Sequence, residues 1–287
     1  MLRKLLIGAG VLAPITFAAA ACGKRAWERR TRALRGDIAA ARMPVHPATV
    51  RFDELAALPA PVQRYFRTVL RDGMLMISGA RASHHGSFNM GGEVARWKPF
   101  RSDQLVVTRR PGFDWDARIA LLPGLPVHVH DAYIAGEGAL RAALLGLVTV
   151  AGVDSTPQLA QGELMRFLAE AAWYPTALLP SQGVHWTAVD DDHANATLED
   201  GGNSATLLFR FNPQGLIDSV HAEARGRAVG KRVIPTPWHG RFWNHQLRSG
   251  MLVPLEGEVA WLTEEGPLPY WRGSMIDISY ELAKQGR

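Results

Sequence analysis

Apolar and polar positions alternate along most of the chain after position 74, and this period of two predicts β-strands. In "ATLLFRF", Leu207, Phe209 and Phe211 fall on one face, while Leu208 and Arg210 fall on the other. Turns rich in Gly, Asn and Asp, such as "DDDH", "EDGGN" and "NPQG", separate the alternating segments, as in antiparallel hairpins. The pattern therefore predicts one antiparallel sheet of about ten or eleven strands, which must curl to remain compact.

A few segments have helical periodicity instead. Pro61 suits the first turn of a helix that places four apolar side chains on one face (Val62, Tyr65, Phe66 and Val69). Two further helices are expected in the middle of the chain, "GEGALRAALLGLVTV" at 136–150 and "GELMRFLAEAAWYP" at 162–175. Helices inserted there would cover the concave face of a half-barrel-like sheet. We thus predict an α+β fold in which residues 51–287 form a single β-rich domain.

The N-terminal segment has a different character. Residues 1–22 contain a basic start, an apolar run from Leu5 and a string of small residues, which predicts a signal peptide or a membrane anchor. The sole cysteine, Cys22, follows "AAA", as in a bacterial lipobox in which Ala19 replaces the usual leucine. A lipidated exported protein, an exported protein with an uncleaved anchor, and a cytoplasm-facing anchor all remain open. Each alternative places the protein at a membrane, and the extracytoplasmic side is favoured.

Charge and composition narrow the possible partners. The chain of 287 residues has a formal net charge of +5, but its basic residues are scattered and are mostly arginine. They do not form a lysine-rich tract interleaved with aromatic residues, which argues against nucleic-acid binding. An exception is "KRAWERRTRALR" within residues 23–50, a basic tether that we expect to be partly helical and to lie against anionic lipid headgroups.

Three segments resemble those of a bacterial membrane-anchored family of unknown function. They are "ELMRFLAEAAWYPTALL" from Glu163, "TPWHG" from Thr236 and "GPLPYWRG" from Gly266. The family resemblance covers most of residues 55–282 and brings no established activity with it. The predicted architecture is also similar to that of the LolA, LolB and LppX-like lipoprotein carriers. That likeness implies a cavity for lipid, although a fold alone does not imply a function.

Aromatic residues near strand ends and at the exit of the second central helix are the strongest candidates for a ligand cavity. They pack a helix against a sheet or line an apolar site with polar groups at its mouth. Arg166 and Arg272 would contact an anionic group there, because arginine binds carboxylates and phosphates in a bidentate manner. The aromatic candidates are Trp173, Tyr174, Trp238, Trp261, Tyr270 and Trp271.

Glu163, Arg166 and Glu170 follow a spacing of three and four residues on the same predicted helix, so they share one stripe. Acid–base chemistry would need two carboxylates with divergent pKa values. An arginine between them favours two ionised carboxylates, and hence an ion-paired brace or an anion clamp. We include all three residues among the ligand-binding candidates.

Evidence for catalysis is weaker. His128 and His130 share one face of a predicted strand and are the best metal-ligand candidates, but further ligands at the usual spacings are missing. Asp131 would point to the other face of the strand or begin a turn. Nucleophile, phosphate-loop and dinucleotide motifs are also missing from the sequence, so no cofactor is predicted.

The leading hypothesis is a non-enzymatic membrane-tethered protein of the cell envelope that binds a lipid-like or other hydrophobic molecule. One alternative is a hydrolase-like enzyme with a site near Arg166, Glu170 and Arg272, or near His128 and His130. A structural or interaction module is the other.

Overall fold

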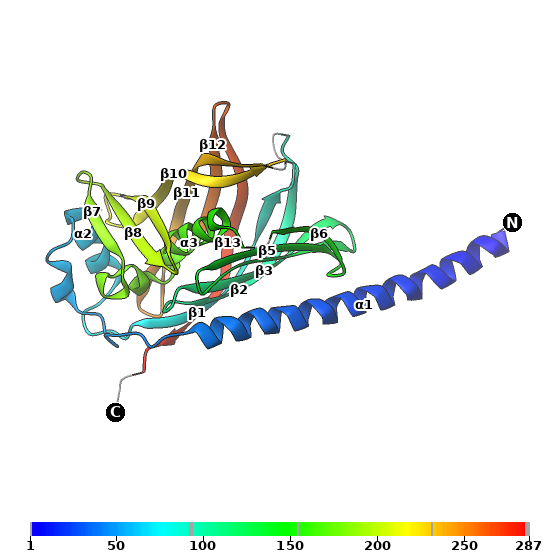
Figure 1. Cartoon of the computed structure of the whole chain (residues 1–287), viewed down its shortest axis with the longest axis horizontal. Coiled ribbons are helices and arrows are strands. Elements are labelled where there is room, and N and C mark those ends of the chain that lie inside the picture. Colours follow the sequence, from blue (N-terminus) through cyan, green and yellow to red (C-terminus); the bar gives the residue numbers. More distant parts are fainter. Residues whose placement is uncertain (1, 92–93, 154, 231, 285–287) are drawn as a thin grey trace.

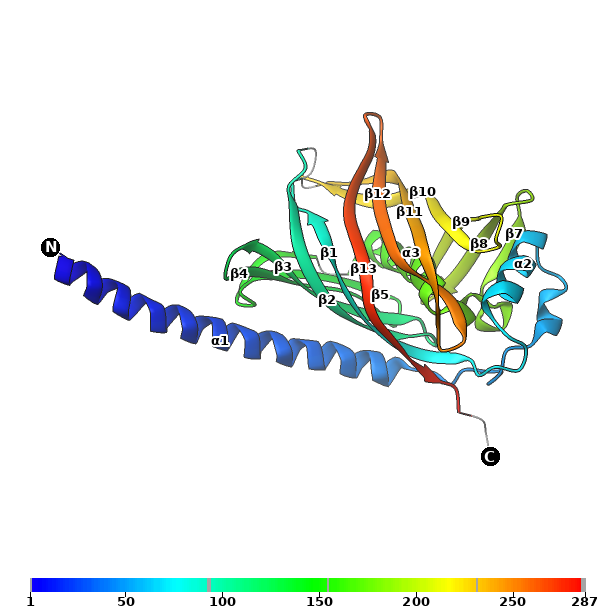
Figure 2. The same cartoon turned by 180° about the vertical axis from the view of Figure 1, so that it is seen from behind.

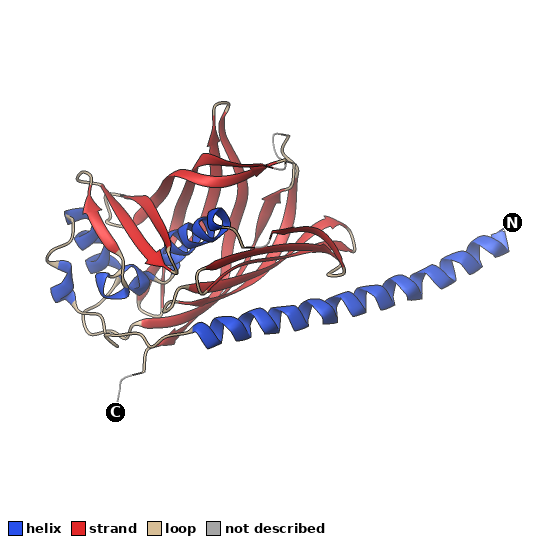
Figure 3. Cartoon of the chain, viewed as in Figure 1, coloured by secondary structure: helices blue, strands red, loops and turns tan. Residues whose placement is uncertain are grey.

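The computed structural model describes the fold of residues 2–91, 94–153, 155–230 and 232–284, and the side chains from Ala20 onward. Thirteen strands in these ranges form one antiparallel sheet, which curls around helix α3 (Figures 1 and 3). The predicted α+β fold with a large curled sheet is confirmed.

The elements have the following bounds. The helices are α1 (Leu2–Ala41), α2 (Ala60–Val69) and α3 (Pro157–Glu170), with short 3-10 turns at η1 (Phe52–Leu55), η2 (Ala171–Trp173), η3 (Pro175–Leu178) and η4 (Pro180–Gln182). The strands are β1 (Ile77–Asn89), β2 (Trp97–Val107), β3 (Gly112–Leu122), β4 (Leu125–Ile134), β5 (Glu137–Leu144), β6 (Val148–Val153), β7 (His185–Ala188), β8 (His193–Asp200), β9 (Asn203–Phe211), β10 (Ile217–Val229), β11 (Arg232–Arg248), β12 (Met251–Thr263) and β13 (Gly266–Leu282).

The strand order places the two ends of the β-rich region beside each other. Hairpins run outward from β1 to the edge strand β6 and from β13 to the edge strand β7, and β1 pairs with β13 at the centre. The chain crosses from one edge to the other through α3 and the turns after it. This crossing fixes α3 inside the curl of the sheet, where the predicted helix over the concave face is found (Figure 1).

The helix predicted at 136–150 is wrong, because that segment forms β5 and β6. A two-residue turn at Ala135 and Gly136, both with positive φ, joins β4 to β5, as in a type I′ hairpin. Leu145 and Gly146 also have positive φ and reverse the chain before β6. Pairing with β4 thus overrides the helical propensity of an Ala- and Leu-rich sequence. Because this segment forms strands, the sheet has thirteen strands where ten or eleven were predicted.

The main core fills the space between the sheet, α2 and α3. The predicted apolar face of α2 is confirmed, since Val62, Tyr65, Phe66 and Val69 are all buried. Thr156 caps α3 by accepting a hydrogen bond from the Leu159 amide at 3.1 Å, which satisfies one of the free donors of the first turn.

Helix α1 packs on the opposite, convex face of the sheet (Figure 2). The Trp27 ring is buried there and stacks on His130, with ring centroids 4.4 Å apart. Its indole Nε1 donates to Asp116 at 2.8 Å, and Ile38 packs with Leu105 and Val107 of β2. Part of the predicted tether is therefore helical and attached to the sheet.

Candidate ligand-binding site

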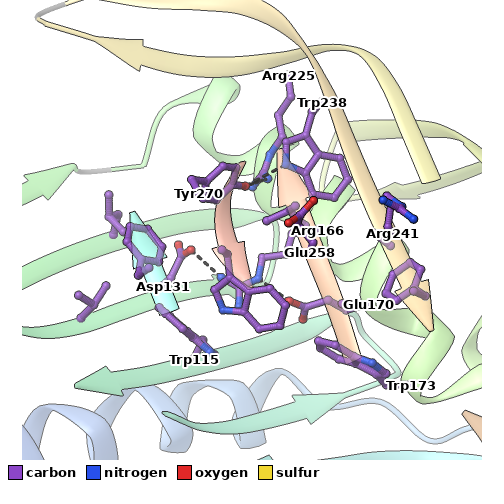
Figure 4. Close-up of a pocket in the computed structure, with 18 residues that line it drawn as sticks. Trp115, Asp131, Arg166, Glu170, Trp173, Arg225, Trp238, Arg241, Glu258 and Tyr270 are labelled. Atoms are coloured by element: carbon purple, nitrogen blue, oxygen red, sulfur yellow. Dashed lines mark hydrogen bonds and ion pairs between the residues drawn. The ribbon is translucent and has the colours of Figure 1, made fainter. Parts of the chain in front are cut away.

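A pocket of about 150 Å³ lies on the concave face, between the C-terminal end of α3 and strands of both halves of the sheet. Figure 4 shows aromatic rings and charged side chains converging on it. The lining residues are Phe88, Trp115, Val129, Asp131, Leu140, Arg166, Ala169, Glu170, Trp173, Arg225, Trp238, Arg241, Phe242, Gly257, Glu258, Val259, Tyr270 and Trp271. The volume is close to that of an engineered cavity of about 150 Å³ that accepts benzene.

Arg166 connects α3 to the sheet beneath the pocket. Its guanidinium donates to Glu170 at 2.7 Å and to Asp131 of β4 at 2.6 Å. It also lies 4.9 Å from the ring centroid of Phe113. Burial opposes the charge of Arg166, but Glu170 and Asp131 outweigh this effect and raise its pKa. Arg166 is therefore a fully engaged cation that fixes the helix to the sheet.

Arg225 is the second buried cation, and its polar contacts are longer than those of Arg166. Its guanidinium lies 3.4 Å from Glu163 and 3.3 Å from the Tyr270 hydroxyl. The rings of Trp238 and Trp261 flank it at 5.2 and 5.9 Å. Cation–π contacts of this kind stabilise a cation without neutralising it. Arg225 thus retains the capacity to bind an anion.

A β-bulge turns Arg225 inward. Ala222 pairs with Trp238 and Arg225 pairs with Thr236, so β10 contains one residue more than β11 between these pairs. Without the bulge, the alternation from the buried Ala222 would place Arg225 on the exposed face. A Cβ atom on Gly162 of α3 would lie 3.4 Å from Arg225 Nε, so the bare helix surface there leaves room for the guanidinium.

A second bulge brings two consecutive aromatic residues to the pocket. Val259 pairs with Trp271 while Ala260 pairs with Pro269, which leaves Tyr270 as the extra residue of β13. Both Tyr270 and Trp271 line the pocket as a result. The Tyr270 hydroxyl accepts a hydrogen bond from Trp238 Nε1 at 2.9 Å, which ties β13 to β11 across the pocket wall.

Two glycines make room for the large rings. In "WHG" and "WRG", a glycine follows a tryptophan by two positions on the same strand face. A Cβ on Gly273 would collide with the Trp271 ring, and a Cβ on Gly240 would lie 3.4 Å from the Trp238 ring and 3.0 Å from Val220. Each ring therefore folds over its glycine and presents a flat apolar surface.

Glu163 lies behind Arg225 and is 4% exposed. Desolvation, together with the nearby charge of Asp131, raises the pKa of Glu163 to about 8, against the opposing effect of Arg225 and Arg166. Around neutral pH this carboxyl group is therefore mostly protonated. The charge of Arg225 then has no ionised carboxylate bound directly to it.

Five polar atoms in or beside the pocket are buried and have no hydrogen-bond partner among the described residues. They are Asp131 Oδ1, Glu163 Oε2, Trp173 Nε1, His84 Nε2 beside Trp173 and Gln104 Oε1 beside Glu170. A buried polar atom without a partner costs about 1–3 kcal/mol. Such atoms indicate a site whose polar groups are completed by something other than the protein chain.

Comparison with known proteins supports the family assignment. A family of unknown function, DUF6920, matches residues 56–280. The chain belongs to this family. Among solved structures, it is similar to a LolA superfamily protein from Nitrosomonas europaea, with a TM-score of 0.43 and 11% identity over 80% of this chain and 96% of that chain. No curated protein matches the sequence significantly.

The segments through which the sequence resembles its family meet at the pocket. Six of the ten predicted ligand-binding residues line it: Arg166, Glu170, Trp173, Trp238, Tyr270 and Trp271. The other four lie outside the lining. Glu163 lies behind Arg225, Trp261 stacks on Tyr270, Tyr174 donates to the Phe167 carbonyl at 2.9 Å, and Arg272 pairs with Glu258 and lies over Trp97.

Several residues of the pocket are absent from the sequence-based candidates. Arg225 and Arg241 are the cations that line it besides Arg166, and Trp115 and Asp131 come from the first half of the sheet. The alternation of β4 had placed Asp131 opposite the two histidines, which is confirmed. The bulge that turns Arg225 inward has no comparable signal in the sequence.

His128 and His130 lie on the convex face of the sheet, where His130 contacts α1. His130 Nδ1 lies 2.7 Å from Asp114 Oδ1, and its Nε2 lies 3.0 Å from Thr31 Oγ1 of α1. Burial lowers the pKa of His128, with a further contribution from Arg118. The described residues contain no group of three or more His, Cys, Asp or Glu side chains suited to a metal ion.

The N-terminal predictions fall largely on residues 1–19, whose side chains lie outside the described part of the structure. Within the described residues, no helix has the length and apolar character required to cross a membrane. Cys22 is exposed and has a free thiol.

Proposed function

We propose that this protein is a membrane-tethered binding protein whose concave pocket holds a hydrophobic molecule carrying an acidic group. The observation that supports the proposal best is Arg225, a cation that is 9% exposed and lies between tryptophan rings at the wall of an apolar pocket. Ligand sites combine mostly apolar walls with a few fixed polar groups, and this pocket has that composition.

The charges around the pocket favour an anion. The positive charge of Arg166 is compensated by Asp131 and Glu170, and the negative charge of Glu258 is compensated by Arg272. Arg225 faces Glu163, whose raised pKa keeps it mostly neutral, and Arg241 adds an exposed guanidinium at the same pocket. A carboxylate or phosphate ester near Arg225 would compensate this positive charge, and the free indole N–H of Trp173 offers a further donor.

The size of the pocket limits the apolar part of the ligand. A cavity of about 150 Å³ accommodates a small ring or part of one alkyl chain. Trp115, Trp173 and Trp271 contribute large aromatic surfaces to its walls, which suit apolar carbon groups. We therefore propose a single-chain or aromatic acid as the ligand class.

Tethering to the membrane is the second part of the proposal. It is supported by the apolar run at 5–21 and the exposed Cys22 after it. Cys22→Ser, followed by membrane fractionation and analysis of signal processing, separates a lipid anchor from an uncleaved helix. A wild-type chain that is shorter than the Cys22→Ser chain indicates processing and lipidation at Cys22, whereas two chains that both remain in the membrane at full length indicate the uncleaved helix.

The ligand class is tested with octanoate, octyl phosphate and octanol, which share one chain and differ in head group. Binding is followed by tryptophan fluorescence, because four of the lining residues are tryptophan, and is quantified by calorimetry. We expect the two anions to bind at least about tenfold more tightly than octanol, as one charge-assisted hydrogen bond contributes about 1.5–3 kcal/mol. Arg225→Met should remove this preference while octanol binding changes little.

A matched control is Arg227→Met, on the same strand but outside the pocket lining, and it should retain the preference for anions. Equal affinity of the wild-type protein for octanol and octanoate would contradict the acidic-group proposal. Failure of all three compounds to bind, with nothing retained in native mass spectrometry of protein purified from membranes, would contradict the binding function itself.

A further inference from the structure

The edge strand β6 exposes apolar side chains where an exposed strand is normally polar. All six of its residues are exposed, and Val148, Val150 and Val153 are among them. Leu147 in the β5–β6 turn and Leu122 at the β3–β4 turn are 43% and 58% exposed. A run of exposed apolar residues on an edge strand invites aggregation unless something covers it.

Helix α1 meets this edge where the predicted membrane segment ends. A Cβ atom on Gly23 would collide with the Leu145 carbonyl and lie 2.8 Å from the Leu147 side chain. The helix backbone therefore touches the β5–β6 turn one residue after Cys22. An N-terminal segment that enters a membrane at this point would bring Leu147 and β6 to the membrane surface, as the position of α1 beside β6 in Figure 1 illustrates.

The charge of α1 at this position matches a lipid surface. Lys24, Arg25 and Arg29 are exposed within two turns of Cys22, and at 1.5 Å per residue they lie within about 11 Å of it. The attraction between basic residues and anionic headgroups acts over about one Debye length, roughly 8–10 Å. These cations therefore lie within range of the headgroups when Cys22 is at the surface.

We propose that β6 and the turns bearing Leu122 and Leu147 form a membrane-contact edge that inserts its apolar side chains into an anionic lipid surface. This inference rests on the proposed tether. Only side-chain tips enter the apolar region, because the free backbone groups of the edge strand require the hydrated headgroup zone. Leu140 of β5 lines the pocket and pairs with Val153, so the edge holds the pocket one strand away from the lipid.

The test uses the full chain in a Cys22→Ser background, reconstituted in vesicles of phosphatidylcholine with or without phosphatidylglycerol. A fluorescent label that senses polarity is attached at Val150→Cys or, as the control, at Val189→Cys. Val189 is 51% exposed and follows β7, the opposite edge of the sheet. We expect a blue shift and quenching by lipid-borne nitroxides at position 150 only, both larger with phosphatidylglycerol.

Other outcomes overturn the inference in different ways. If the protein floats with vesicles but both labels remain in water, the contact edge is absent and the tether stands. If the protein does not float with vesicles, the unlipidated N-terminal segment does not insert and the contact edge does not hold the chain at the lipid surface, so the inference fails while a lipid anchor on Cys22 stands. If unlabelled Val150→Cys chains form disulfide-linked dimers spontaneously, edge-to-edge pairing of two chains covers β6 and lipid does not.

Discussion

Strand β4 carries a buried polar network on each face, and the two networks differ in how completely their atoms are bonded. On the convex face, His130 contacts Asp114 and Thr31 through its two ring nitrogens. The second oxygen of Asp114 accepts from Arg35 at 2.9 Å. On the concave face, Arg166 and Arg225 hold the network together, but Asp131, Glu163 and Trp173 each retain a buried atom without a partner in the described structure.

The difference in bonding indicates a structural role for the convex network and a ligand-binding role for the concave network. The convex network attaches α1 to the sheet, and its atoms are bonded within the protein, while His128 Nδ1 and Arg141 Nε on the same face lack a partner among the described residues. Such a network stabilises one arrangement and has little left to offer a ligand. The concave network retains free acceptors, a free donor and a partly compensated cation beside an apolar pocket. Substitutions on the convex face should therefore change stability, and those on the concave face should change binding.

The largest effect is expected for Asp114→Ala on the convex face. The substitution leaves the buried His130 and the partly exposed Arg35 without their shared, fully buried carboxylate. Removing one partner of a buried charged pair costs about 3–5 kcal/mol, which urea unfolding would detect. Asp277→Ala, at an exposed position of β13, is the control and should cost little. A loss of octanoate binding in folded Asp114→Ala protein, without a loss of stability, would contradict the division between the two faces.

The next largest effect is expected for Gly273→Ala on the concave face. The new Cβ collides with the Trp271 ring and moves it from the pocket wall, so octanoate affinity should fall by about tenfold. Overpacking of this kind costs about 1–3 kcal/mol of stability. Gly152→Ala, also in a strand but with only Thr149 within 4 Å at 3.8 Å, should leave both quantities nearly unchanged. Unchanged binding in Gly273→Ala would show that Trp271 does not contact the ligand.

A smaller, pH-dependent effect is expected for Glu163→Gln. The folded-state pKa of about 8 lies above the unfolded value, so the folded state binds the extra proton between about pH 4.5 and 8. The free energy of unfolding of the wild-type protein therefore falls with rising pH in this window, by at most about 1.4 kcal/mol per pH unit from this group.

Glu163→Gln removes this slope, and the stability difference between the variant and the wild type should grow in favour of the variant as pH rises. The slope arises first from the burial of Glu163 and then from the charges of Asp131, Arg225, Arg166 and Glu170, all of which remain in the variant. Glu223→Gln, at an exposed position of the same strand as Arg225, should follow the wild-type curve. Parallel curves for wild type and Glu163→Gln would show that Glu163 is ionised in the folded protein.

Period-two alternation and turn residues were sufficient to predict the sheet, because each hairpin is determined locally. The segment at 136–150 could not be assigned in this way. Its Ala and Leu content favours a helix, and only pairing with β4 makes it a strand. The position of Asp131 followed from alternation along β4. Four aromatic residues of the pocket were identified, namely Trp173, Trp238, Tyr270 and Trp271, because large rings at strand ends must pack against something.

The cations of the site were harder to assign, because β-bulges change which face a residue occupies. Arg225 faces the pocket only through the extra residue after Ala222. Alternation along β10 alone would place the Arg225 side chain in solvent. Arg272 was chosen as an anion contact because arginine suits bidentate binding, but the bulge that brings Tyr270 and Trp271 inward together leaves Arg272 on the outer side, paired with Glu258.

The smallest effect is therefore expected for Arg272→Ala, which tests that assignment directly. The Arg272 side chain is 54% exposed, and an exposed ion pair contributes at most about 1 kcal/mol to stability. Octanoate affinity should change by less than about twofold, whereas Arg225→Met loses the preference for anions. The two arginines lie on different faces of the same sheet. Calorimetry of both variants at one pH therefore compares the contributions of the two faces to octanoate binding under identical conditions. An Arg272→Ala variant that lost octanoate binding would place the anion contact at the outer side of β13 and would remove Arg225 from the proposed site.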